Sequence, residues 1–257
     1  MTVGWNSERY LKFSAQRTQP AIDLAARIPL ENPAEIIDVG CGPGNSSRVL
    51  KDRYPKAHVL GVDSSENMLA KAKEDNPDMD FVLLDAGGDI SGYNSRFDVV
   101  FSNACLQWIP DHEKLLARLF ALLKPGGTLA VQIPMNFDEP IHKILTELLE
   151  SAEWHEKLGI PRLFYTLTQE EYFDVISGLT DDFEMWQTTY CHRMPDHEAI
   201  VEWYRATGMR PYLEALNERD SAEFERQVLE RVKREYKVRE NGEIIFRFPR
   251  FFFIAQK

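Results

Sequence analysis

The sequence has few cysteines and no long apolar run. Its three cysteines, Cys41, Cys105 and Cys191, lie far apart, which argues against a disulfide framework and against a CxxC zinc site. No apolar stretch is long enough to cross a membrane, and the chain does not open on a charged segment followed by an apolar core. These absences predict a cytoplasmic protein that does not associate with membranes.

Basic residues are also scarce. The chain of 257 residues has 30 Lys and Arg against 41 Asp and Glu, which gives a net charge of −11 at pH 7. Binding along a nucleic-acid backbone needs concentrated basic residues, so a nucleic-acid partner is not expected. A small anionic ligand would need a local basic pocket. A hydrophobic content of 44%, with 15 Phe, 9 Tyr and 5 Trp, is enough for a folded core.

The first half of the chain alternates helix and strand signals. Helical patterns, beginning with PAIDLAARIPL, separate five short apolar strands: AEIIDVG, HVLGVD, DFVLLDA, RFDVVFSN and TLAVQIP. This alternation predicts an α/β fold with a doubly wound, Rossmann-like parallel sheet. Ligands of such sheets bind beyond the carboxyl ends of the strands, so the loops after the first four strands are expected to form the site.

The pattern changes after Pro134. Helical segments are expected over residues 139–178 and 196–236, and two late strands are FEMWQTTYCHRM and EIIFRFPRFFFIAQK. The helix DHEKLLARLFALLKPGG is expected to stop at its Lys-Pro-Gly-Gly end. Long helical connections around two late strands suggest helical cap insertions within a single domain of residues 1–257.

The strongest motif is IIDVGCGPGNSS, in which an acidic residue precedes a glycine-rich turn. Glycines let the backbone turn tightly and approach a ligand, and the following helix offers unpaired N–H groups. The spacing is D-x-G-x-G-x-G. It departs from the dinucleotide pattern GxGxxG because Asn45 stands where the third glycine would be. An acidic Asp38 ahead of the turn suits a ligand that carries an amino group.

Polar residues also end the next three strands. Asp63 lies roughly 20 residues beyond the glycine loop, where a carboxylate can accept hydrogen bonds from a ribose, although it would also cap the next helix. Asp85 is either an acceptor for an adenine amine or an ordinary turn residue. Asn103 can offer its backbone carbonyl to the ligand's amino group. The segment from Leu106 to Trp108 can wall the reaction site, unless Trp108 is a core residue.

The set IIDVGCGPGNSS, LGVD, LLDA and FSNACLQWIPD resembles the class I S-adenosylmethionine-dependent methyltransferases over residues 34–134. The resemblance implies a seven-stranded sheet whose last strand is antiparallel, and S-adenosylmethionine as cofactor with S-adenosylhomocysteine as product. It also implies that Asp63 holds the ribose, that Asp85 binds the adenine amine and that Met68 packs on the adenine. The complete cofactor set predicted is Arg17, Asp38, Gly40, Gly42, Gly44, Asp63, Ser64, Met68, Asp85, Ala86, Asn103 and Leu106.

A closer resemblance covers nearly the whole chain. The segments WNSERYLKFSAQRTQPA, SNACLQWIPDH, TTYCHRMPDHEAI, ATGMRP and ENGEIIFRFPRFF are similar to the trans-aconitate methyltransferases, which esterify a carboxylate of a small unsaturated tricarboxylic acid. A carboxylate is ionised at pH 7, so no general base and no catalytic residue in that sense is expected. An alternative within the same class is a phenolic or quinone-like acceptor. A binding module without turnover and, less favoured, a nicotinamide-dependent oxidoreductase remain as other readings.

A polycarboxylate needs cations, and the planar fork of arginine matches a carboxylate best. The candidates lie mainly in the region of the expected cap. The predicted substrate-binding set is Tyr10, Trp108, Tyr190, His192, Arg193, Trp203, Arg205, Arg210 and Arg247. No metal is expected, because His192 and His197 are five residues apart with Pro195 between them, and no carboxylate-rich or cysteine partner is near.

A helix is expected over residues 6–17, within WNSERYLKFSAQR. Asn6 is a good N-cap, and Trp5 and Tyr10 have the spacing of a hydrophobic staple. Tyr10, Phe13 and Arg17 share one face of this helix. We expect it to act as a lid on the cofactor cleft, with Arg17 meeting the carboxylate of the cofactor or of the substrate. The alternative is packing against the sheet with Arg17 in solvent.

Overall fold

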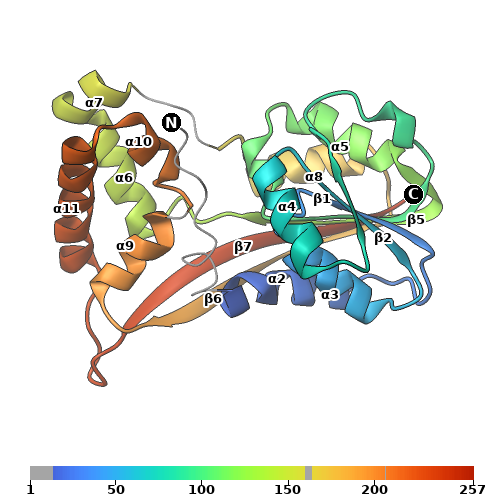
Figure 1. Ribbon diagram of the computed structural model, residues 1–257, viewed down its shortest axis with the longest axis horizontal. Coiled ribbons are helices and arrows are strands. Elements are labelled where there is room, and N and C mark those ends of the chain that lie inside the picture. The colour runs from blue at the N-terminus through green and yellow to red at the C-terminus, as the bar shows by residue number, and fades with distance from the viewer. Residues whose placement is uncertain (1–13, 160–163, 206) are drawn as a thin grey trace. The chain divides into compact units, whose positions relative to one another are not determined.

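The computed structural model describes residues 14–159, 164–205 and 207–257 (Figure 1). The chain divides into two compact units, where the sequence suggested one domain with cap insertions. The sheet unit comprises Ala15–Pro134, Phe164–Thr188 and Arg250–Lys257, and the helical unit includes Met135–Leu163 and Thr189–Pro249. Two long strands, β6 (Phe183–Met194) and β7 (Ile244–Gln256), run through both units.

The sheet has seven strands in the order β3-β2-β1-β4-β5-β7-β6. The first five are parallel, and β7 pairs antiparallel with β5, which confirms the predicted topology. Strands that are central in this order are buried on both faces, which is why they read as continuous apolar runs. The bounds of the first five strands are β1 Glu35–Val39, β2 His58–Asp63, β3 Asp80–Leu83, β4 Phe97–Asn103 and β5 Leu123–Pro134.

The register brings the polar strand ends to one edge. Asp38 of β1 pairs with Gly61 of β2, and Asp63, at the end of β2, pairs with Leu83 of β3. Asn103 ends β4. Because these strands all run in one direction, their carboxyl ends meet at the same edge of the sheet, as the motifs required.

The helices of the sheet unit pack on both faces of the sheet, with α2 and α3 on one face and α5 and α8 on the other (Figure 1). Their starts are defined locally: Ser65 accepts a hydrogen bond from the Met68 N–H at the start of α4, and Thr168 with Glu171 forms a capping box at α8. The bounds are α2 Ser14–Ala26, α3 Asn45–Arg53, α4 Glu66–Asp75, α5 His112–Ala121 and α8 Gln169–Ser177.

Two predicted helix boundaries were wrong. A single helix, α2, runs through Pro20, where the sequence suggested separate helices on either side. Proline removes one hydrogen bond, but here it does not end the helix. The helix α5 ends at Ala121, and β5 begins at Leu123, so the Lys-Pro-Gly-Gly segment lies inside the strand. Its pairing with β4 is irregular between Phe97 and Val99, which accommodates the extra residues.

The helical unit has its own core. Aromatic and aliphatic side chains from five helices and from the first part of β7 form one buried cluster, which includes Trp154, Trp203, Phe224 and Phe246. The segment predicted as helical over residues 139–178 is divided, because α6 and α7 belong to this unit and α8 belongs to the sheet unit. The bounds are α6 Pro140–Glu150, α7 Ala152–Leu158, α9 His197–Arg205, α10 Arg210–Ala215 and α11 Glu218–Glu235.

Candidate functional site

The glycine-rich loop joins β1 to α3 by a backbone that only glycine adopts easily. Gly40 has a φ of 73°, and a Cβ at this position would lie 2.1 Å from the Cys105 Sγ. Gly42 has a φ of 55°, and a Cβ built there would meet none of the described atoms within 4 Å. Gly40 therefore lets the loops after β1 and β4 pack together, while Gly42 borders open space that a ligand can approach.

Asp38 lies beneath this loop and is fully buried. Its Oδ2 accepts hydrogen bonds from the Ser46 Oγ at 2.6 Å and the Ser47 Oγ at 2.7 Å. Its Oδ1 is buried and has no hydrogen-bond partner among the residues described. Burial raises the pKa of Asp38 to about 6, against the two serine hydrogen bonds, which lower it, and with a smaller upward contribution from the charge of Asp63. Such a buried carboxylate oxygen can accept a hydrogen bond from a cationic group.

Asp63 connects the ends of β1 and β2. Its Oδ2 accepts a hydrogen bond from the Gly42 N–H at 2.9 Å, and its Oδ1 accepts one from the Ser65 N–H at 2.9 Å. The carboxylate therefore orders the glycine loop and the turn into α4 together. Because an ionised carboxylate has about four acceptor positions, it can still accept hydrogen bonds from a ligand. Nearby, Ser64 is exposed and Met68 is half-buried in the first turn of α4.

The loop after β3 presents Asp85 at the surface. The Asp85 Oδ1 accepts a hydrogen bond from the Gly87 N–H at 2.8 Å, and Ala86 between them is buried. The Arg118 guanidinium donates to the carbonyls of Gly87 and Gly88 at 3.0 and 3.1 Å, which holds this loop against α5. One oxygen of Asp85 thus shapes the turn, and the exposed carboxylate has room for a second contact.

The loop after β4 places Asn103, Leu106 and Trp108 in different environments. Asn103 is half-buried, and its side-chain Oδ1 has no partner within the described part of the chain. Leu106 is fully buried and begins a short 3-10 turn that ends at Trp108. Trp108 is 42% exposed and its ring centroid lies 4.9 Å from that of Phe164, so it is a surface residue and not part of the core.

The two N-terminal candidates have different outcomes. Tyr10 and the predicted helix over residues 6–13 lie outside the described residues. Arg17 lies in α2 of the sheet unit and is 8% exposed, so the alternative of an Arg17 side chain in solvent is wrong. Its role as a cofactor ligand stays a prediction.

The predicted arginines of the helical unit contact carboxylates of the same unit. Arg193 makes two hydrogen bonds to Glu243 at 2.8 Å, and Arg205 makes two to Glu225 at 2.6 and 2.7 Å. Arg210 contacts Glu214 one helical turn away. A guanidinium that already faces a carboxylate must give up or share that contact to bind a substrate carboxylate.

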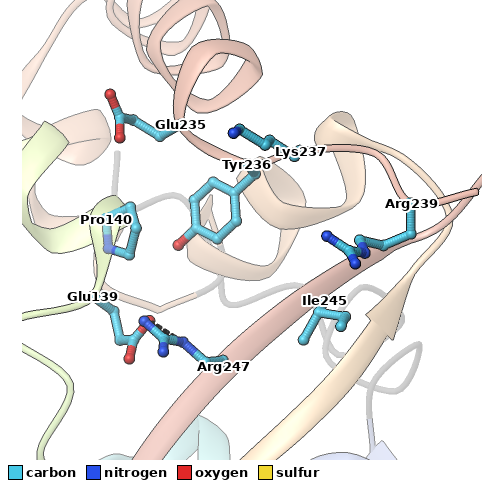
Figure 2. Close-up of a pocket in the computed structure, with 8 residues that line it drawn as sticks. All are labelled: Glu139, Pro140, Glu235, Tyr236, Lys237, Arg239, Ile245 and Arg247. Atoms are coloured by element: carbon cyan, nitrogen blue, oxygen red, sulfur yellow. Dashed lines mark ion pairs between the residues drawn. The ribbon is translucent and has the colours of Figure 1, made fainter.

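Arg247 differs because it lines a cavity (Figure 2). The cavity has a volume of about 250 Å³. The Arg247 Nε lies 3.3 Å from the Glu139 Oε2, and this is the only ion pair of Arg247 with a described residue. Lys237 and Arg239 also line the cavity, and neither forms an ion pair with a described residue. The cations of the lining therefore outnumber its carboxylates. The residues of the lining are Glu139, Pro140, Glu235, Tyr236, Lys237, Arg239, Ile245 and Arg247.

The remaining candidates form an aromatic cluster in the helical unit. The His192 ring packs near two aromatic rings, that of Tyr190 with centroids 6.2 Å apart and that of Trp203 with centroids 5.0 Å apart. His192 and Trp203 are both buried. This packing accounts for their positions structurally, and a contact with substrate stays a prediction for all three.

Sequence reasoning missed several residues that shape the site. Ser46 and Ser47 lie close in sequence to the glycine loop, so their hydrogen bonds to Asp38 could have been predicted from the local sequence. Cys105, His112 and Tyr172 come from separate elements, and no local signal joins them. Within the described residues, no group of three His, Cys, Asp or Glu side chains is placed to hold a metal ion. The described helices also include none that is long and apolar enough to span a membrane.

The fold and the loops at its carboxyl edge define the class of protein. The methyltransferase domain family matches residues 36–127, which contain β1 to β4 and their loops. A solved structure of the YcgJ protein from Bacillus subtilis covers 93% of the chain and 98% of its own length, with a TM-score of 0.62 and 14% identity. Phosphoethanolamine N-methyltransferase 2 from Haemonchus contortus, in complex with S-adenosyl-L-methionine, covers 92% of the chain and 52% of its own, with a TM-score of 0.56 and 20% identity. These two structures share the fold.

Curated relatives extend the match to the whole chain. Trans-aconitate 2-methyltransferase from Escherichia coli is 40% identical over 255 residues, 98% of both chains. The enzyme of the same name from Shigella flexneri is 40% identical over the same length. The chain belongs to the family of S-adenosylmethionine-dependent methyltransferases that includes these enzymes. It is a methyltransferase, and its cofactor is S-adenosylmethionine.

Proposed function

We propose that this enzyme methylates a carboxylate of trans-aconitate and releases a monomethyl ester and S-adenosylhomocysteine. The name of the relatives that match 98% of the chain supports the acceptor. The observation that carries the assignment of the cofactor site is the buried Oδ1 of Asp38, which has no hydrogen-bond partner among the described residues, just before the loop that contains Gly42. A carboxylate there complements the ammonium group of the cofactor's methionine portion.

The other cofactor contacts follow from the same edge of the sheet. Asp63 accepts from the ribose hydroxyls while it keeps its two backbone hydrogen bonds, and Asp85 accepts from the adenine amine with its exposed carboxylate. The backbone carbonyl of Asn103 receives the ammonium group together with Asp38. The glycine loop of Gly40, Gly42 and Gly44, with Ser64, Met68, Ala86 and Leu106, supplies the surrounding surface. Arg17 contacts a carboxylate of the cofactor or of the acid.

The chemistry asks little of acid–base groups. The bound cofactor supplies an electrophilic methyl group, and the acceptor is already an anion at neutral pH. The protein must therefore orient the acceptor and keep water away. Leu106 and Trp108 wall the reaction site in this proposal, which fits a buried Leu106 beside an exposed indole.

Arg247 is the strongest of the proposed acid-binding residues. It lines a cavity with two further cations, in a chain whose net charge is −11. Its ion pair with Glu139 uses Nε, so the terminal nitrogens can donate to a substrate carboxylate. Tyr190, His192, Arg193, Trp203, Arg205 and Arg210 remain candidates in the same unit. A cytoplasmic enzyme that acts on a small anion, with no nucleic-acid or membrane partner, is the cellular setting proposed.

The test is turnover with methyl-labelled cofactor against a panel of di- and tricarboxylic acids and phenolic acceptors. The proposal expects labelled product from trans-aconitate that mild alkali cleaves, as it cleaves an ester. Arg247→Gln should raise the KM for the acid by roughly tenfold or more, since a charged hydrogen bond is worth about 1.5–3 kcal/mol. The KM for S-adenosylmethionine should not change.

Arg226→Gln is the matched control, because it removes an exposed guanidinium of the helical unit that already pairs with Glu223 and Glu230 and is not among the acid-binding candidates. Alkali-stable product from a phenol, with none from trans-aconitate, would reject the acid and favour the aromatic acceptor. Equal acid KM values in both variants would remove Arg247 from the acid site.

A further inference from the structure

The loop between β4 and α5 is held in an uncommon backbone conformation at both of its ends. Ala104 has a φ of 55° and Asp111 has a φ of 58°, and neither is a glycine. Residues with a side chain rarely adopt this left-handed region, and they remain in it only where their surroundings hold them. The loop contains the turn Leu106–Trp108, so the contacts that hold this turn decide its shape.

One such contact comes from His112 at the start of α5. The His112 side chain is 2% exposed, and its Nε2 lies 2.9 Å from the Leu106 carbonyl oxygen. A carbonyl only accepts, so Nε2 carries the hydrogen. The His112 Nδ1 lies 2.5 Å from the Tyr172 hydroxyl. Burial lowers the pKa of His112, and in the neutral ring Nδ1 accepts a hydrogen bond from the Tyr172 O–H.

Tyr172 is itself fixed within the sheet unit. It is fully buried in α8, and its ring stacks on Phe251 of β7 with centroids 5.4 Å apart. A line of contacts therefore runs from β7 through Tyr172 and His112 to the Leu106 carbonyl. A second tie comes from the segment before α8, where the Tyr165 N–H donates to the Gln107 carbonyl at 2.9 Å.

We propose that His112 and Tyr172 are positioning residues for methyl transfer. Their hydrogen bonds fix the Leu106 carbonyl and thereby hold the turn Leu106–Trp108 in the shape that orients the acceptor. This inference rests on the proposed function in that it takes the turn as a wall of the reaction site. Neither residue contacts the reacting atoms in this proposal, and both act through the loop.

Tyr172→Phe is the sharpest test, because it removes one hydroxyl and keeps the stacked ring. We expect kcat to fall roughly ten- to a hundredfold, as for a small misplacement of reacting groups, with the KM for S-adenosylmethionine within about twofold of wild type. Amide hydrogen exchange of residues 104–109 should become faster. Tyr54→Phe is the matched control: it also removes a buried tyrosine hydroxyl, one that donates to the Leu30 carbonyl at 3.1 Å and lies away from every residue assigned to cofactor or acid. It should leave both kcat and exchange in the loop unchanged.

His112→Gln and His112→Ala give an independent readout. The glutamine amide nitrogen can donate to the Leu106 carbonyl as the imidazole Nε2 does, so His112→Gln should retain more kcat and more loop protection than His112→Ala. This pair decides the matter if Tyr172→Phe fails to fold. Wild-type kcat and wild-type loop exchange in Tyr172→Phe, or equal losses in the two His112 variants, would overturn the proposal. If the wild-type enzyme methylated no acid, the proposed function would fail, while the exchange of the loop would still test the positioning contacts.

Discussion

Asp38 combines two properties that seldom occur together in one side chain. It is fully buried, yet one of its oxygens has no partner among the described residues, while the other accepts two serine hydroxyls. Burial raises the pKa of Asp38 to about 6, so the carboxylate is charged at neutral pH at a cost to the unliganded protein. The folded state takes up this proton more readily than the unfolded chain, so Asp38 adds stability as the pH falls below about 6. Cofactor binding should have the opposite dependence.

We therefore predict that S-adenosylhomocysteine binds less tightly as the pH falls through about 6. Its ammonium group needs the charged form of Asp38, and each pH unit below the pKa costs at most a factor of about ten. Calorimetric titration from pH 5 to pH 8 measures this directly. The variant Asp38→Asn should bind weakly at pH 8 and should lose this dependence. A pH profile that is the same in both proteins would show that Asp38 is not the group responsible.

At the level of elements, the loops after β1 and β4 pack closely because Gly40 has no side chain. A Cβ on Gly40 would lie 2.1 Å from the Cys105 Sγ and 2.3 Å from the Cys105 Cβ. Burial raises the pKa of Cys105 to about 12 and keeps the thiol neutral. The Sγ therefore contributes packing to the glycine loop and no charge. The glycine thus serves the approach of two loops as well as the turn itself.

Gly40→Ala should lower the free energy of unfolding by about 1–3 kcal/mol more than Gly126→Ala, and it should abolish measurable cofactor binding. Gly126 is the matched control, since its φ of 79° is close to the 73° of Gly40 and its Cβ would meet no described atom within 4 Å. Both variants therefore carry the backbone cost, about 1–2 kcal/mol, and only one carries the clash. Denaturant unfolding of the two proteins measures the difference. Equal destabilisation would mean that the loops can move apart freely.

What the sequence predicted well was set by short-range patterns. The five parallel strands, the glycine loop and the polar strand ends each lie within one segment, and the parallel topology then brings them to one edge. The environment of the arginines could not be predicted, since Arg205 meets Glu225 from a different helix. Likewise, His112 and Tyr172 are 60 residues apart, and only packing joins them. The predicted helix boundary at Pro20 was wrong, because proline usually ends a helix but α2 continues through this residue.

At the level of the whole molecule, the residues proposed to bind the cofactor and most of those proposed to bind the acid belong to different units. The described residues assigned to the cofactor, from Arg17 to Leu106, all belong to the sheet unit. Most residues assigned to the acid, including Arg247, belong to the helical unit, and Trp108 belongs to the sheet unit. This division separates the two binding events experimentally, because a variant in the helical unit can change the acid KM without changing cofactor affinity.

Hydrogen exchange with and without S-adenosylhomocysteine tests where the cofactor binds. The placement at the carboxyl edge predicts slower exchange in the loops after the first four strands: residues 40–45, 63–65, 85–87 and 103–107. Exchange in α11, which belongs to the helical unit, should change little. Protection confined to the helical unit, or absent from all four loops while the ligand is bound, would contradict the placement of the cofactor on Asp38, Asp63 and Asp85.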